Sequence, residues 1–245
     1  MYEEFAEVYD TFMEDVPYDA WALSITDTLR THGVAEGALV LDLACGTGQM
    51  TRRLARAGYD MIGVDASPEM LAVAGRASDE GILYLCQDMR SFELYGTVAA
   101  IVCVCDSLNY LLTDAAIDRT FALAANYLDP GGLLMFDIKT RYVYEELLAD
   151  RVFAENADRG SYIWENSFDV DTAINEYDLT LFLRQEDGRY ARYAETHTQR
   201  AYEAEEITAL LEKNGFGVLS VTDAQTGGAV QNDTERIFFT AQVNK

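Results

Sequence analysis

Residues 39–48, LVLDLACGTG, decide the fold that this chain is expected to adopt. The apolar run 39–43 stops at Gly46 and Gly48, two glycines separated by one residue, and residues 49–57 then follow a helical pattern. A buried strand that leads into a glycine turn and a helix brings backbone N–H groups against a ligand. The stretch therefore predicts a ligand site at a strand-to-helix turn of a parallel α/β sheet.

A second apolar run, residues 61–65, ends in an acid, Asp65. A carboxylate at the end of a neighbouring strand can accept hydrogen bonds from both hydroxyls of a ribose. The same aspartate could instead cap the next helix, although Ser67 already suits that role. Together with the glycine turn, Asp65 indicates a nucleoside ligand.

The dinucleotide fingerprint G-x-G-x-x-G is incomplete in this chain, because Thr51 stands where the third glycine belongs. Asp42 lies inside the strand end, where it disfavours a pyrophosphate and suits a ligand that carries an ammonium and a sulfonium. A dinucleotide-dependent oxidoreductase is therefore a distant alternative.

The order D-L-A-C-G-T-G (42–48), then V-D-A-S-P-E-M-L (64–71), then Asp88 resembles the first motifs of class I S-adenosylmethionine-dependent methyltransferases. The resemblance covers about 35–150 and 203–243. It implies a doubly wound, Rossmann-like α/β fold, S-adenosylmethionine as cofactor and methyl transfer as the activity.

The resemblance also implies how the cofactor is held. Asp65 would bind the ribose, Ala66 and Met70 would pack on the adenine, and Asp88 with the Met89 N–H would read the adenine edge. A surface turn is the other interpretation of Asp88. The expected cofactor-binding set is Tyr9, Tyr18, Trp21, Asp42, Ala44, Cys45, Gly46, Thr47, Gly48, Asp65, Ala66, Met70, Asp88, Met89, Cys105 and Asp106.

The segment C-D-S-L-N-Y, residues 105–110, follows the fourth strand, where the resembling enzymes face the transferred methyl group. It lacks the Asn/Asp-Pro-Pro-aromatic motif, which argues against chemistry on the N6 atom of adenine. Asp106 is a candidate for holding an amine, accepting a proton or capping the following helix. Tyr9 and His197 are the other candidates for catalysis, although a solvated strand histidine also fits His197. In-line methyl transfer depends mostly on positioning, so no triad is expected.

Three parts are expected along the chain. Residues 1–34 form a helical leader in which Tyr9, Tyr18 and Trp21 either face the sulfonium or belong to an ordinary core stripe. Residues 35–150 and 203–245 form the cofactor-binding core, with strands at 38–43, 60–65, 82–86, 98–104 and 132–138, and helices at 48–57, 67–77 and 114–128. A helix at 205–213 and strands at 217–223 and 235–243 complete it.

Residues 151–202 change to a period of two, which predicts three antiparallel strands inserted before the last helix. An insertion of this length is expected to form a β-sheet lid over the mouth of the cofactor site.

Composition limits the function further. Among 245 residues, 42 are acidic and 18 basic, a net charge of −24, which disfavours nucleic-acid partners and anionic membranes. Four cysteines in apolar runs and two separated histidines indicate a reduced, cytoplasmic protein and no metal site. No apolar run is long enough for a membrane span. A monomer and a homodimer both remain open.

The sequence thus predicts a methyltransferase that uses S-adenosylmethionine and acts on a small molecule. An RNA or protein methyltransferase is the alternative within the family. A non-catalytic regulatory protein that binds S-adenosylmethionine is the alternative outside catalysis.

Overall fold

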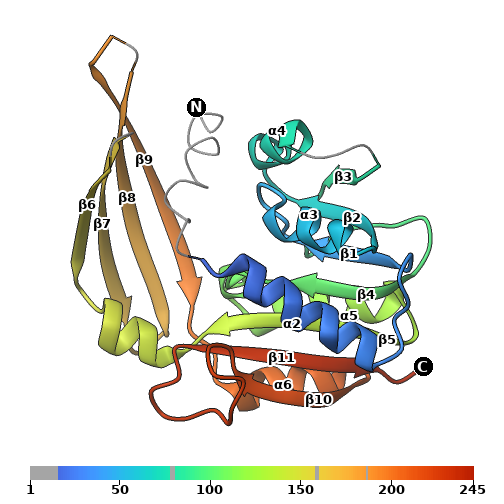
Figure 1. The fold of residues 1–245 in the computed structure, drawn as a ribbon. Helices are drawn as coiled ribbons and strands as arrows, with labels where there is room; N and C mark the ends of the chain where they lie inside the picture. The colour runs from blue at the N-terminus through green and yellow to red at the C-terminus, as the bar shows by residue number, and fades with distance from the viewer. Residues whose placement is uncertain (1–15, 78–80, 158–159, 186) are drawn as a thin grey trace.

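The computed structural model describes residues 16–77, 81–157, 160–185 and 187–245. Its centre is a seven-stranded sheet in the order β10-β11-β5-β4-β1-β2-β3 (Figure 1). The strands β1 to β5 run parallel, whereas β11 is antiparallel to β5 and β10 is antiparallel to β11. The bounds are β1 Leu39–Leu43, β2 Asp60–Asp65, β3 Leu83–Cys86, β4 Val98–Cys103, β5 Leu128–Lys139, β10 Phe216–Asp223 and β11 Arg236–Val243.

Both faces of this sheet are buried, which explains the continuous apolar runs in its strands. One face packs against α5 (Asp114–Tyr127) and α6 (Ala204–Lys213). The other packs against α2 (Tyr18–Thr31) and α3 (Gln49–Arg56), while α4 (Pro68–Ala77) lies beside β2 and β3 (Figure 1). The predicted doubly wound α/β fold is confirmed.

The insertion is a separate antiparallel sheet that stands beside the core (Figure 1). Its strands follow one another as β6 Val152–Ala157, β7 Gly160–Asp169, β8 Ile174–Arg184 and β9 Tyr190–Arg200. The sequence predicted three strands, and the structure has four. The short edge strand β6 was missed because its run VFAENA does not alternate cleanly between apolar and polar residues.

Two further local predictions were wrong. A one-turn π-helix, η2 (Val143–Leu148), joins β5 to the insertion where no element was expected. The strand β5 begins at Leu128 rather than at 132, because Val98 pairs with Leu128 and Ala100 with Leu133. Residues 129–132 therefore form an irregularity within this pairing, between the expected helix and the expected strand.

Both ends of the insertion leave the core at one buried side chain, Asn109, in the 3₁₀-helix η1 (Ser107–Tyr110). Its Nδ2 donates to the carbonyl oxygens of Lys139 (3.1 Å) and Arg200 (2.8 Å), and its Oδ1 accepts from the Lys139 N–H (3.0 Å). One amide thus fixes where the lid sheet joins the core.

The first part of the predicted helical leader, including Tyr9, lies outside the described residues. Its second part contains α2, which begins after Pro17. In the described ranges, the helices are too short or too polar to cross a membrane.

Candidate active site

A cavity of about 660 Å³ opens where the carboxyl ends of the parallel strands face the lid sheet. The loops that follow β1, β2, β3 and β4 line one side of it, and side chains of β7, β8 and β9 line the other. Ligands of open α/β sheets bind at this edge, so the cavity lies where the strand order predicted a site.

The glycine bend after β1 joins the end of β2 through a carboxylate. The Gly46 N–H donates to Asp65 Oδ2 at 2.8 Å, and the Ser67 N–H donates to Asp65 Oδ1 at 2.8 Å. Gly46 has φ +53°, and a Cβ there would meet no protein atom within 4 Å. A side chain at this position would therefore extend into open space, which fits a turn kept bare for a ligand.

Gly48 has a different reason to be glycine. It has φ +76°, and a Cβ there would lie 2.6 Å from the Tyr84 hydroxyl oxygen. Gly48 begins α3, and its side chain position faces protein rather than the cavity. Glycine is needed at this position for the backbone conformation of the turn and because Tyr84 leaves no room for a side chain.

Asp42 is a buried acid at the end of β1 that lines the cavity. Its Oδ2 accepts a 2.5 Å hydrogen bond from the Thr51 hydroxyl. Burial raises the pKa of Asp42 to about 7, with the nearby Asp65 charge adding to the effect. Thr51, which breaks the dinucleotide fingerprint, thus holds an acid suited to a cationic group.

Asp88 follows β3 and lines the same cavity with Met89. The Arg90 side chain donates to both oxygens of its carboxylate, and the Arg90 N–H donates to Oδ1 at 2.7 Å. These hydrogen bonds lower the pKa of Asp88, which keeps it ionised.

The strand ends at the cavity carry backbone strain. Ala44, Cys105 and Asp106 have positive φ values of 61°, 63° and 51°. Non-glycine residues adopt this conformation at a cost of about 1–3 kcal/mol each, and such strain collects at functional sites. These three positions follow β1 and β4, the two central strands.

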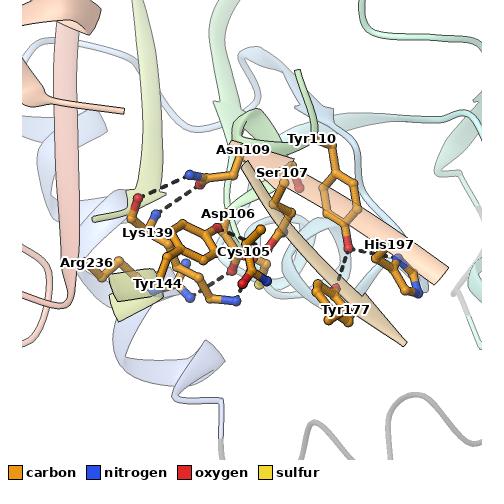
Figure 2. Close-up of polar contacts among 12 residues, drawn as sticks. Cys105, Asp106, Ser107, Asn109, Tyr110, Lys139, Tyr144, Tyr177, His197 and Arg236 are labelled. Carbon is orange, nitrogen blue, oxygen red and sulfur yellow. Dashed lines mark hydrogen bonds and ion pairs between the residues drawn. The ribbon is translucent and has the colours of Figure 1, made fainter. Parts of the chain in front are cut away.

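Asp106 lies in a buried cluster of charges (Figure 2). Its carboxylate pairs with Lys139 (3.0 Å) and Arg236 (2.8 Å) and accepts from Gln199 of the lid (2.9 Å). Burial alone would raise the pKa of Asp106, but the two cations lower it to about 2. Arg236 also binds Asp137, whose pKa is raised by burial.

The lid presents aromatic side chains to the cavity. Tyr162 and Trp164 of β7, Tyr177 of β8 and His197 of β9 line it together with Tyr110 of η1. The Tyr110 hydroxyl lies 2.9 Å from the Tyr177 hydroxyl and 3.2 Å from His197 Nδ1 (Figure 2). The Tyr177 and His197 rings stack with centroids 4.8 Å apart.

Most of the predicted site residues meet in this one cavity. Its lining includes Tyr18, Asp42, Ala44, Cys45, Gly46, Thr47, Asp65, Ala66, Met70, Asp88, Met89, Cys105, Asp106 and His197. Gly48 and Trp21 are outside this lining set. The Trp21 ring instead contacts Tyr18 and lies under Arg236, with 5.3 Å between the guanidinium and the ring centroid.

The sequence did not predict Lys139, Arg236 or the aromatic side chains of the inserted sheet as site residues. Lys139 ends β5, and Arg236 begins the antiparallel strand β11 and pairs with it, so both lie at the ligand edge. The strand-end rule that selected Asp65 could have selected them. Trp164 and Tyr177 gave no such signal, because nothing local shows which face of an inserted sheet turns toward the core.

Comparisons with known proteins agree with this geometry. A family model described as a methyltransferase domain matches residues 40–132. YqeM of Bacillus subtilis (strain 168), a protein assigned to the methyltransferases, is 38% identical over 100% of this chain and 98% of its own length. A solved S-adenosylmethionine-dependent methyltransferase from Clostridium acetobutylicum ATCC 824 is 29% identical, covers 100% of this chain with 99% of its own, and has a TM-score of 0.90.

A more distant relative is named for its substrate. The dTDP-3-amino-3,4,6-trideoxy-alpha-D-glucopyranose N,N-dimethyltransferase of Streptomyces venezuelae is 33% identical over 56% of this chain and 58% of its own length.

The chain belongs to the class I S-adenosylmethionine-dependent methyltransferases. It is therefore an enzyme whose cofactor is S-adenosylmethionine, as the motifs predicted. The dinucleotide alternative is excluded by this membership.

Proposed function

We propose that this methyltransferase acts on a small molecule that presents an amine or a hydroxyl. The observation that carries the proposal is a single cavity, shared by the Gly46 and Asp65 bend and by the aromatic side chains of the lid. Its volume of about 660 Å³ lies within the range of small-ligand pockets. A cofactor and a small acceptor would therefore sit in one enclosed space.

The cofactor contacts are assigned to residues at the strand ends and, for Met70, to the helix α4 that follows β2. Asp65 has lone pairs left on both carboxylate oxygens for the ribose hydroxyls. Ala66 and Met70 would pack on the adenine, and Asp88 with the Met89 N–H would bind its edge. Asp42 and the backbone of Cys105 would hold the cationic methionine end. When bound, the cofactor supplies an electrophilic methyl group on a sulfonium.

Asp106 fits an anchoring role better than proton transfer. Its pKa of about 2 makes it a weak base, and Lys139 and Arg236 already balance its charge. Cys105 is likewise no nucleophile, because burial raises the pKa of its thiol to about 12. Tyr9 stays a catalytic candidate outside the described residues.

Two features support a small acceptor over RNA or a protein. The net charge of −24 opposes a polyanion. The dimethyltransferase relative is named for an amino sugar, a small amine. The four cysteines are free thiols, which supports the proposed cytoplasmic location.

Calorimetry with S-adenosylmethionine, S-adenosylhomocysteine and NAD tests the cofactor site. We expect Asp65→Ala to weaken S-adenosylmethionine binding by about 100-fold, because hydrogen bonds to a charged group contribute about 1.5–3 kcal/mol each. Asp60→Asn, an exposed acid at the start of β2, is the matched control and should bind normally. Unchanged affinity in Asp65→Ala would refute the assigned ribose contact.

The acceptor is tested by transfer of labelled methyl groups to amino sugars, amino acids, aryl amines and phenols, with bulk RNA and a protein extract alongside. Labelling confined to small molecules supports the proposal. Labelling of RNA or protein alone would refute the small-molecule acceptor. Cofactor binding without transfer to any compound of the panel would count against an amine or hydroxyl acceptor.

A further inference from the structure

A chain of hydrogen bonds crosses from the core to the lid beside the cavity. It runs from Tyr177 to Tyr110 (2.9 Å), from Tyr110 to His197 Nδ1 (3.2 Å), and from His197 Nε2 to Glu195 (3.2 Å). Tyr110, Tyr177 and His197 line the cavity, whereas Glu195, on β9, is outside this lining set. Glu195 and His197 share one face of β9 because residues two apart on a strand point the same way.

Glu195, the last group in this series of hydrogen bonds, determines which atoms donate and which accept. A carboxylate only accepts, so His197 Nε2 carries the hydrogen of this bond, and in an uncharged ring Nδ1 is then an acceptor. Tyr110 must then donate to Nδ1, and Tyr177 must donate to Tyr110. A phenolic oxygen has two lone pairs, so Tyr110 keeps one that can accept from a ligand in the cavity.

We propose that Tyr110, His197 and Glu195 form the proton relay of this enzyme, and that the acceptor therefore reacts through a nitrogen or oxygen that gives up a proton. The inference rests on the proposed function. Tyr110 and His197 are the catalytic residues in it, and Glu195 is a positioning residue that fixes the ring and stabilises its charge.

The relay balances the reaction. As the acceptor atom bonds to the methyl carbon and the bond from that carbon to sulfur breaks, the acceptor proton moves to Tyr110 Oη. The proton of Tyr110 moves to His197 Nδ1, and the resulting imidazolium faces the Glu195 carboxylate. Release of that proton to water resets the chain.

Tyr110 by itself does not suit the role of base. Burial raises the pKa of its phenol far above neutrality, and the Asp106 and Glu195 charges act in the same direction. It stays protonated and passes a proton only when it receives one. Among the described residues, the titratable groups in contact with the imidazole are Tyr110 of η1, Tyr177 of β8 and Glu195 of its own strand.

Nitrogen-15 NMR of the histidine side chains tests the geometry without an acceptor. Only His32 and His197 contribute signals, so His32→Gln assigns the spectrum. We expect the neutral His197 ring with hydrogen on Nε2, and a shift of the Nδ1 signal in Tyr110→Phe. In Glu195→Ala the His197 ring should populate both tautomers. In Glu195→Gln the hydrogen should stay on Nε2, because the amide oxygen still accepts from it. Hydrogen on Nδ1 in the unaltered protein would overturn the relay.

Turnover of acceptors found in the methylation panel tests the chemistry. We expect His197→Gln to lower kcat by about 100-fold with little change in KM, because general-base catalysis contributes about 10²–10⁴-fold. The loss should shrink as pH rises and the acceptor ionises by itself. Glu195→Gln should lose rate although it keeps the tautomer, and His32→Gln should match the unaltered enzyme.

The outcomes separate the two proposals. A kcat in His197→Gln equal to that of His32→Gln overturns the relay and leaves the small-molecule function standing. Labelling of RNA or protein alone refutes the small-molecule function, while the NMR result still decides the hydrogen-bond chain.

Discussion

At the scale of the residue, Asp42 couples stability to pH. Its pKa is about 7 in the folded chain and 3.8 in the unfolded chain, so the fold prefers the protonated form. The stability that this preference contributes is complete below pH 3.8 and is lost as pH rises to 7. Near neutral pH, ionisation of Asp42 thus suits a cationic ligand but lowers the stability of the fold.

We expect Asp42→Asn to raise the melting temperature at pH 8 by about 5 °C, because the neutral amide removes a buried charge. The gain should shrink toward pH 4, and S-adenosylmethionine should bind about tenfold more weakly. Scanning calorimetry at both pH values, with Asp60→Asn as control, checks this. A gain independent of pH would contradict the explanation.

At the scale of the element, Arg236 joins three strands and a helix. It begins β11 and pairs with Asp106 after β4 and with Asp137 on β5, and it covers the Trp21 ring of α2. One guanidinium therefore compensates two buried carboxylates, of which Asp106 also pairs with Lys139.

We expect Arg236→Met to lower the free energy of unfolding at pH 7 by about 3 kcal/mol, because it removes the cationic partner of the buried Asp137 and leaves Asp106 with Lys139 alone. The deficit should be smaller at pH 4.5, since Asp137, whose pKa is already raised, then takes up a proton. Urea unfolding at both pH values measures it. Arg192→Met, at an exposed position on β9, is the control, and an equal effect there would count against this role.

The elements also show what the sequence could predict. The parallel strands were predicted because they are mostly apolar runs separated by helical patterns and turn residues. Asp65 was selected as the acid at the end of the second strand, whereas Asp88 and Asp106 were selected through the resemblance to the family motifs. The edge strand β6 was not predicted, because its residues do not alternate between apolar and polar. The contact of Glu195 with His197 of the cavity wall was not predicted either, because it depends on how the two sheets meet.

At the scale of the whole molecule, charge is the dominant feature. With 42 acidic and 18 basic residues, the folded surface repels itself. Two of those basic residues, Lys139 and Arg236, are committed to the buried cluster around Asp106 and so contribute little to the outer surface.

We expect the melting temperature to rise by a few degrees between about 20 mM and about 500 mM NaCl, because salt screens this repulsion. Thermal unfolding followed by circular dichroism measures the change. A fall with added salt would mean that surface ion pairs outweigh the excess negative charge.

The junction at Asn109 has a consequence for how such an enzyme changes over generations. Both ends of the insertion are held by this one amide, and Gln199 of β9 also donates to Asp106, so the insertion meets the core over a short stretch beside the junction. We therefore expect the strands far from this junction to tolerate changes of length and sequence more readily than the residues of β9 beside it.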